Sequence, residues 1–135
     1  MSPTHLVDTG WIIRHLRGAR TYTQTLRRIG VQNLAISIVS VAELYEGVYR
    51  ADDPKAAERK VQTFLSETAV LPITQDICRL FGRHRAALRR QNRLIGDLDL
   101  LIAASCLHHN LTLLTTNPRH FQRVPELTVV SRPGS

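Results

Sequence analysis

Short apolar segments alternate along the chain with longer stretches in which apolar residues recur every three or four positions. The short segments are rich in Val, Ile, Leu and Thr, a composition typical of buried strands. We predict five strands, at residues 5–7, 34–38, 69–73, 111–115 and 127–130. The longer stretches have the spacing of helices with one apolar face, and they predict helices at 41–50, 55–65, 75–93 and 98–109.

The alternation of strands with helices determines the expected fold class. Strands joined through helices pair in parallel, because each crossover returns the chain to the same edge of the sheet. The pattern predicts an α/β fold, with a mainly parallel sheet covered by helices on both faces. No Pro/Gly/Ser-rich linker or internal repeat interrupts it, so we expect a single domain over residues 1–135. Ligands of such sheets bind beyond the carboxyl ends of the strands, so functional residues are expected there.

An isolated carboxylate stands directly after the first predicted strand. Asp8 is the only acidic residue before Glu43, although five arginines lie between them. One explanation is functional, because a lone acid at a strand end is placed where ligands bind. The other is structural, since Asp8 could accept an amide hydrogen bond as the N-cap of a helix containing residues 11–16.

Further acids occupy equivalent places. Glu43 comes just after the second predicted strand, and Asp97 and Asp99 stand at the start of the apolar helix at 98–109. Structural explanations exist here too: Ser40 and Glu43 have the spacing of a capping box, and one of the two aspartates could cap its helix. Two carboxylates before a nearly all-apolar, buried helix are nevertheless costly unless a cation meets them.

Oxygen-bearing side chains thus follow four successive segments at one edge of the predicted sheet. The fourth strand ends in Thr115-Thr116-Asn117, which adds hydroxyl and amide oxygens to the acids. Carboxylates that converge raise one another's pKa unless a divalent cation neutralises them, and Mg²⁺ or Mn²⁺ suits ligands that are all oxygen. Such a site could activate water and stabilise the leaving oxygen in phosphodiester hydrolysis.

The charge of the chain favours a polyanionic partner. The sequence carries 18 Lys and Arg against 11 Asp and Glu, a formal net charge of +7, and sixteen of its cations are arginine. Arginine binds phosphate oxygens with two parallel hydrogen bonds, so nucleic acid is the first candidate, although an Arg-rich genome composition would explain the excess equally well. Arg85, Arg89 and Arg93 fall four residues apart, as candidates for RNA contacts or as a solvated helix face.

Four motifs that contain these acids resemble those of PIN-domain ribonucleases and, among them, of the VapC toxins of bacterial toxin-antitoxin pairs. In chain order they are LVDTGWII at 6–13, SIVSVAELYEGV at 37–48, IGDLDLLIAA at 95–104 and LLTTNPRHF at 113–121. The resemblance implies a three-layer α/β/α sandwich and RNA cleavage that depends on Mg²⁺ or Mn²⁺. It also implies a homodimer and a small VapB-type antitoxin whose tail occupies the active groove.

The resemblance assigns roles to three carboxylates. Asp8, Glu43 and Asp99 match the metal-binding acids of the family. Asp8 and Asp99 are expected to hold the principal metal, with Glu43 binding it directly or through water. The implied reaction is in-line attack of activated water on phosphorus, which leaves 3′-hydroxyl and 5′-phosphate ends.

Four more residues are expected to support the site. Asp97 is an acid that many relatives also carry, and Asn117 matches a position occupied by Asp or Asn. The absence of a fourth carboxylate at Asn117 weakens the case for a tightly held second metal. Thr116 and Ser40 match hydroxyl-bearing positions that line the family's site.

Two other functions compete with a ribonuclease. Asp8-Thr9-Gly10 also spells the signature of aspartic proteases, but that class needs an all-β chain. A PIN-like module that binds RNA or an antitoxin without cleavage is the second alternative, and the presence of all three main acids speaks against it. No glycine-rich nucleotide-binding motif follows a predicted strand.

The remaining features bear on location and on redox chemistry. The longest uninterrupted apolar run, 100–104, is too short to span a membrane, and residues 1–19 lack a signal-peptide pattern, so we expect a cytoplasmic protein. Cys78 and Cys106 are expected to be small core residues rather than parts of a disulfide or zinc site. Trp11 is expected to anchor the core.

Overall fold

The computed structural model describes residues 2–134 and contains one five-stranded sheet. Its order is β3-β2-β1-β4-β5, and all neighbouring strands are parallel. The strands are β1 (His5–Val7), β2 (Leu34–Ser37), β3 (Ala69–Leu71), β4 (Thr112–Leu114) and β5 (Val129–Val130). The predicted α/β class is confirmed, and the all-β architecture that an aspartic protease needs is excluded.

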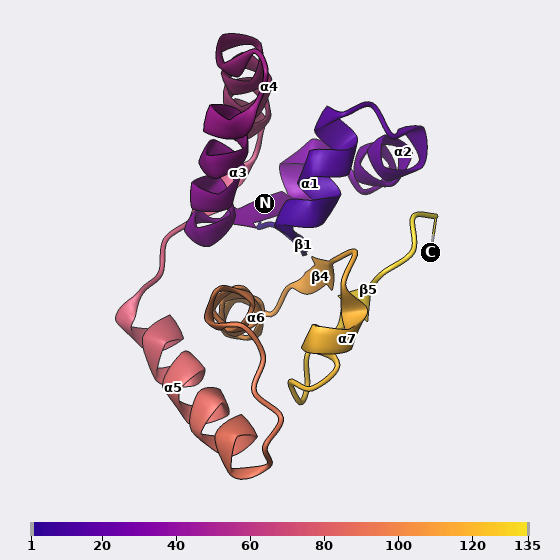
Figure 1. Ribbon diagram of the computed structural model, residues 1–135. Helices are drawn as coiled ribbons and strands as arrows, with labels where there is room; N and C mark the ends of the chain where they lie inside the picture. Colours follow the sequence, from indigo (N-terminus) through magenta and orange to yellow (C-terminus); the bar gives the residue numbers. More distant parts are fainter. Residues whose placement is uncertain (1, 135) are drawn as a thin grey trace.

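The helices form a layer on each side of the sheet (Figure 1). One layer contains α1 (Thr9–Leu16), α2 (Arg20–Ile29), α3 (Ile38–Arg50) and α4 (Pro54–Glu67). The other contains α5 (Gln75–Arg90), α6 (Asp97–His109) and α7 (Pro118–Phe121). A single 3-10 turn, η1 (Val31–Asn33), leads from α2 into β2. The molecule therefore has the three-layer α/β/α arrangement that the resemblance implied.

Side chains that alternate along the strands supply two apolar cores. Leu6 and Leu113 belong to the core beneath α5, α6 and α7, whereas Val7 and Leu114 belong to the core beneath α1 to α4. Trp11 is fully buried in the second core, as predicted. The central strands β1, β2 and β4 have buried apolar residues on both faces, so they appear in the sequence as short continuous apolar runs. The prediction of a buried strand at 69–73 is wrong, because Ala69 and Val70 of the edge strand β3 are exposed.

Helix α3 begins three residues earlier than predicted. The buried Ser37 hydroxyl caps the helix by accepting a hydrogen bond from the backbone N–H of Val39 at 3.0 Å. Ser40 and Glu43 therefore lie inside α3, and the interpretation of these two residues as a capping box is wrong. Their side chains are free of a capping role and face the end of the sheet instead.

Helix α5 ends earlier than predicted. Its last residue is Arg90, and Asn92 follows with a left-handed φ of 55°. Arg93 therefore lies outside the helix, and the predicted stripe of three arginines on one helix is reduced to Arg85 and Arg89. The reason is local, because a left-handed residue cannot continue a right-handed helix.

Three smaller points complete the comparison with the sequence. Helix α2 is absent from the predicted elements. Cys106 is buried as expected, but Cys78 is exposed on α5, so its assignment to the core is wrong. Within residues 2–134, no helix is long and apolar enough to cross a membrane.

Candidate functional site

Three acids from three segments meet at the carboxyl edge of the sheet. Asp8 directly follows β1, and Glu43 lies in the second turn of α3, which directly follows β2. Asp99 lies in the first turn of α6, which leads back into β4, so this turn stands at the same edge. The charges of Asp99 and Glu43 both act on Asp8. The three predicted carboxylates therefore stand at the same edge of the sheet, and the charges of Glu43 and Asp99 reach Asp8.

Asp8 lies at the buried bottom of the site with only 7 % of its surface exposed. It is the N-cap of α1, as the structural explanation predicted, because Oδ1 accepts from the backbone N–H of Thr9 at 2.8 Å. Oδ2 accepts from the hydroxyl of the fully buried Thr115 at 2.7 Å. Burial raises the pKa of Asp8, the two hydrogen bonds oppose this rise, and the charges of Asp99 and Glu43 add to it.

Glu43 is tied to α1 through a hydroxyl group. The Thr9 Oγ1 atom lies 2.7 Å from Glu43 Oε1 and 2.8 Å from Ser40 Oγ. A carboxylate can only accept, so Thr9 donates its proton to Glu43, and the buried Ser40 can donate its own to Thr9. Ser40, predicted to support the site, therefore contacts Thr9 and acts on Glu43 only through the Thr9 hydroxyl.

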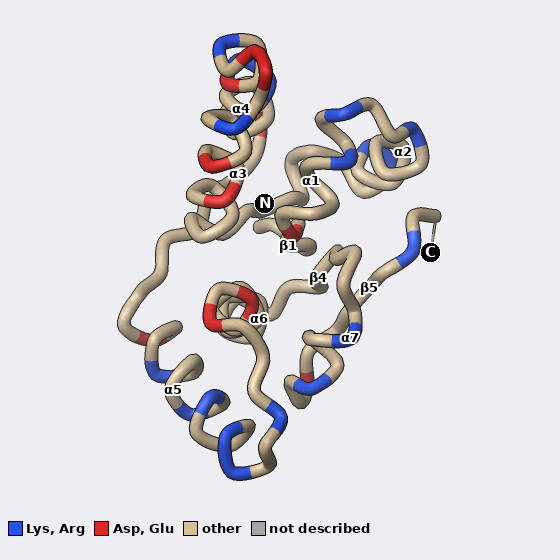
Figure 2. The backbone as a smooth tube through the Cα atoms, viewed as in Figure 1, with Lys and Arg blue, Asp and Glu red and all other residues tan. Residues whose placement is uncertain are grey.

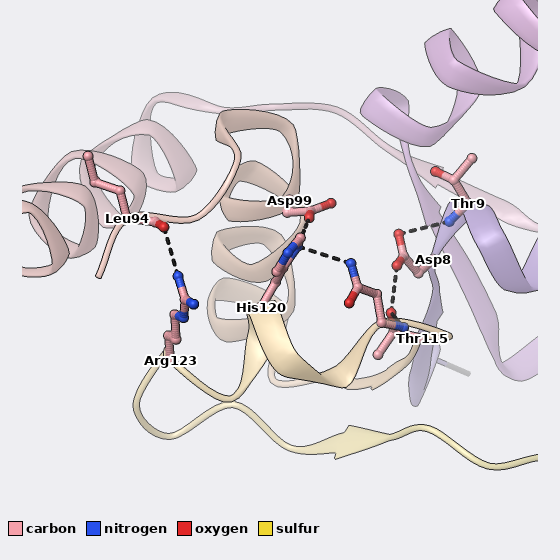
Figure 3. A network of polar contacts seen from close by, with 8 residues as sticks. Asp8, Thr9, Leu94, Asp99, Thr115, His120 and Arg123 are labelled. Atoms are coloured by element: carbon pink, nitrogen blue, oxygen red, sulfur yellow. Dashed lines mark hydrogen bonds and ion pairs between the residues drawn. The ribbon is translucent and has the colours of Figure 1, made fainter. Parts of the chain in front are cut away.

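Asp99 makes its side-chain contact with a histidine of α7. His120 Nδ1 lies 2.9 Å from Asp99 Oδ2 and 3.0 Å from Asn117 Nδ2 (Figure 3). The same figure shows Asp8 and Thr115 beyond this pair, at the end of β1 and β4. Asn117 is exposed and is the N-cap residue of α7, so it stands at the mouth of the site rather than at its bottom.

Asp97 has a different partner from the other acids. Its Oδ1 accepts from Arg85 Nε at 2.8 Å, in an ion pair that is open to solvent. The N-cap of α6 is Gly96 and no side chain caps this end, so the interpretation of Asp97 or Asp99 as a helix cap is wrong. Figure 2 shows the acidic start of α6 across from the basic residues of α5. Among the described residues, Arg89 makes no ion pair and is exposed.

Thr116 contacts the first turn of α1 rather than an acid. A Cβ added at Gly10 would lie 2.5 Å from Thr116 Oγ1, so the glycine is what allows the two segments to approach. Thr116 was predicted to line the site, yet its neighbour Thr115 is the residue that contacts Asp8. The sequence did hold one indication of the role of Thr115, because its hydroxyl group directly follows a buried strand.

Two more residues of the site were missed by the sequence reasoning. Thr9 and His120 both contact an acid through their side chains. His120 lies within the fourth motif, but nothing in its spacing indicates a contact with an aspartate 21 residues earlier. Thr9 was considered only as part of the Asp8-Thr9-Gly10 signature of aspartic proteases, and not as a residue of a ribonuclease site.

The donor set is chemically suited to a hard divalent cation. It consists of carboxylate, hydroxyl and amide oxygens. Burial raises the pKa of Asp8 and the charges of Asp99 and Glu43 add to the rise, and a bound cation would offset both effects. In this conformation both oxygens of Asp8 and one oxygen each of Glu43 and Asp99 contact polar groups of the protein. Within residues 2–134, no three His, Cys, Asp or Glu side chains are gathered closely enough to hold an ion.

Comparison with known proteins agrees with the geometry. The PIN domain family model matches residues 5–127. The chain is 38 % identical over 125 residues to Ribonuclease VapC10 of Mycobacterium tuberculosis, covering 90 % of this chain and 89 % of that one. It is 32 % identical over 108 residues to Ribonuclease VapC2 of Rickettsia felis, covering 79 % of this chain and 81 % of that one.

The fold of a solved complex matches as well. The crystal structure of VapBC2 from Rickettsia felis, bound to a DNA fragment from their promoter, superposes with a TM-score of 0.86 at 27 % identity. The match covers 96 % of this chain and 98 % of that one. The relatives are ribonucleases, which supports an enzyme over a non-catalytic binding module. The chain therefore belongs to the PIN-domain family, within the VapC ribonuclease toxins of toxin-antitoxin systems.

Proposed function

We propose that this VapC-type ribonuclease is a cytoplasmic, single-domain endoribonuclease that uses Mg²⁺ or Mn²⁺ held by Asp8, Glu43 and Asp99. The observation that carries the proposal is the convergence of three carboxylates from three segments at one sheet edge, one of them buried. The charges of Asp99 and Glu43 repel that of Asp8, and proteins maintain such an arrangement at sites that bind cations or move protons.

The protein groups around the acids hold the carboxylates in place. Thr115 and the Thr9 amide each donate to one oxygen of Asp8, which opposes the rise of its pKa caused by burial. The Thr9 hydroxyl donates to one oxygen of Glu43 and holds that carboxylate in place. A divalent cation bound here would supply Lewis-acid activation of water and neutralise the charge that develops on the phosphate. Asn117 stands at the mouth, where it can orient the substrate, and Thr116 packs against the first turn of α1.

Arginines beside the site are suited to contact the RNA backbone. Arg89 and Arg93 are exposed, and among the described residues neither makes an ion pair. Arg85 is different, because its guanidinium already pairs with Asp97. We expect Arg89 and Arg93 to bind phosphates and Arg85 to position the start of α6.

Cleavage of labelled RNA tests the proposed site. Purified wild type is compared in Mg²⁺ or Mn²⁺ and in EDTA with Asp8→Asn and Asp99→Asn. We expect both substitutions to lower kcat/KM by at least about 100-fold, since they remove carboxylates that would hold the cation that stabilises the transition state. Asp76→Asn is the matched control, because Asp76 is an exposed acid that pairs with Arg79 on α5. Metal-independent cleavage, or full activity of Asp99→Asn, would contradict the assignment.

An apolar groove between α1, α3 and α4 is suited to the antitoxin. It has a volume of about 330 Å³, and Ile13, Leu44 and Val48 lie among its apolar lining residues, with Arg17 and Lys60 among its cations. A second hollow of about 460 Å³ shares Leu16 and Lys60 with it, so the two form a continuous surface. This surface fits an amphipathic segment with acidic residues. The VapBC2 structure is a complex of such a pair, and we propose a VapB-type antitoxin as the occupant.

Two glycines provide a matched test of this groove. Gly47 lines the groove, and a Cβ added there meets nothing within 4 Å, so Gly47→Leu should fill the groove without disturbing the fold. Gly82 on α5 is equally unobstructed but lies outside the groove. After co-expression with the cognate antitoxin, Gly47→Leu should lose co-purification while Gly82→Leu keeps it. Equal co-purification of both variants would place the antitoxin elsewhere.

Exposed apolar residues beside the site are suited to a second copy of the chain. Ile38 is 44 % exposed at the start of α3, Leu98 is 50 % exposed at the start of α6, and these two helices pack together. We propose that they contribute to a homodimer interface. Leu98→Glu should then yield a monomer by light scattering after gel filtration, whereas Tyr49→Glu, at a residue 73 % exposed near the far end of α3, should not. A dimer that persists in Leu98→Glu would refute this interface.

A further inference from the structure

His120 has no role in the proposed reaction, yet it is the side chain that contacts Asp99. Its Nδ1 atom lies 2.9 Å from Asp99 Oδ2 (Figure 3). We propose that His120 is a positioning residue that holds Asp99 through Nδ1 so that the other carboxylate oxygen is directed to the cation. The inference rests on the proposed function, because it assumes that Asp99 is a metal ligand.

The short helix α7 is anchored in a way that fixes the place of His120. Phe121, the next residue, is fully buried in the core beneath α6. Asn117 N donates to Thr115 Oγ1 at 3.0 Å, which joins the start of α7 to the residue that holds Asp8. On the other side, Arg123 Nη1 donates to the carbonyl of Leu94 at 2.9 Å, in the loop before α6 (Figure 3). The imidazole is therefore placed by a scaffold attached to both the sheet and α6.

The donor and acceptor rules determine which contact of Nδ1 is the stronger. A carboxylate can only accept, so the proton on Nδ1 is donated to Asp99. The Asn117 amide nitrogen is itself a donor and cannot bond to a nitrogen that carries a proton, so its 3.0 Å contact is the weaker alternative. A charge-assisted bond from Nδ1 to Asp99 is therefore favoured.

This arrangement has the form of the outer contacts that support metal ligands. Ligating carboxylates are commonly held by a hydrogen bond to one oxygen, which restricts rotation of the group, and loss of such a contact weakens metal binding about 10- to 100-fold. Among the described residues, His120 is the one whose side chain lies within hydrogen-bond distance of the Asp99 carboxylate. The Asp99 and His120 side chains are 27 % and 42 % exposed, so solvent would compete for Asp99 if the imidazole were removed.

Two amide variants separate the roles of the two ring nitrogens. The amide nitrogen of Asn lies as far from Cβ as Nδ1 does, and that of Gln reaches the place of Nε2. We expect His120→Asn to bind Mn²⁺ within about threefold of wild type and His120→Gln and His120→Ala to bind it at least about tenfold more weakly. Free Mn²⁺ is measured by electron paramagnetic resonance during titration of the purified chain. Arg119→Ala, at an exposed residue of the same helix, is the control.

The outcomes are distinguishable from failure of the proposed function. Mn²⁺ affinity that is lost in Asp99→Asn but unchanged in all three His120 variants would overturn the positioning role alone. Retention by Gln with loss by Asn would overturn it in favour of a contact made by Nε2. Wild type that binds no Mn²⁺ would overturn both proposals. Thermal unfolding in EDTA should be the same for the Asn and Gln variants, so that a folding defect cannot produce the expected difference.

Discussion

Replacing Thr115 by Val removes one hydroxyl group from the buried bottom of the site and keeps nearly the same shape. The hydroxyl donates to the Asp8 carboxylate at 2.7 Å and accepts from the backbone N–H of Asn117 at 3.0 Å. A hydrogen bond to a charged group contributes about 1.5–3 kcal/mol, and a neutral one about 0.5–1.5 kcal/mol. Because Thr115 is fully buried, water cannot replace either bond. We expect Thr115→Val to lower the free energy of unfolding by about 2–4 kcal/mol.

Urea unfolding in EDTA at a series of pH values measures this loss and identifies its origin. The bond to Asp8 stabilises the ionised carboxylate, so its contribution is present above the folded pKa of Asp8 and disappears as the pH falls through that value. That pKa is raised, so the change lies above the ordinary value of 3.8. Thr115→Ser, which keeps the hydroxyl, should retain most of the stability. A loss below about 0.5 kcal/mol, or one that does not depend on pH, would refute the reasoning.

Three other predictions use the same preparation of protein. Gly10→Ala should lower the free energy of unfolding by about 1–3 kcal/mol, because its Cβ would lie 2.5 Å from Thr116 Oγ1. Gly82→Ala, at an unobstructed helix position, should raise it by about 1 kcal/mol. Equal urea midpoints for the two variants would argue against the close approach of Gly10 and Thr116. The raised pKa of Asp8 means that the folded state holds its proton more tightly than the unfolded chain, so stability falls as the pH rises through that range. In EDTA, Asp8→Asn should lack this fall and gain about 1.4 kcal/mol over wild type at pH 7 for each unit of the shift, and parallel pH profiles would contradict it. Arg89→Ala should raise KM without lowering kcat and reduce the salt dependence of RNA binding by about one charge, and an unchanged salt slope would exclude a phosphate contact.

The sequence alone was sufficient to predict the layers of the fold and the edge of the sheet that carries the acids. Apolar runs of three to five residues mark the strands, of which β1, β2 and β4 are buried on both faces, and their alternation with helical stretches predicts parallel pairing. Parallel pairing places all carboxyl ends at one edge, so the position of Asp8 directly after the first strand and of Glu43 soon after the second already placed both acids at that edge. These are properties of short windows of sequence, which is why they could be predicted.

Tertiary structure alone decided which group satisfies each acid. Thr115 and Asp8 are 107 residues apart, Thr9 and Glu43 are 34 apart, and neither pairing follows from a local pattern. The starts of the helices could not be predicted from local sequence either. Ser40, Glu43 and Asp97 are residue types that often cap helices, but Ser37 and Gly96 occupy the cap positions. Each of these side chains could form hydrogen bonds with several kinds of partner. The partner it has is the group that packing places beside it, and packing depends on contacts between segments that are distant in the sequence.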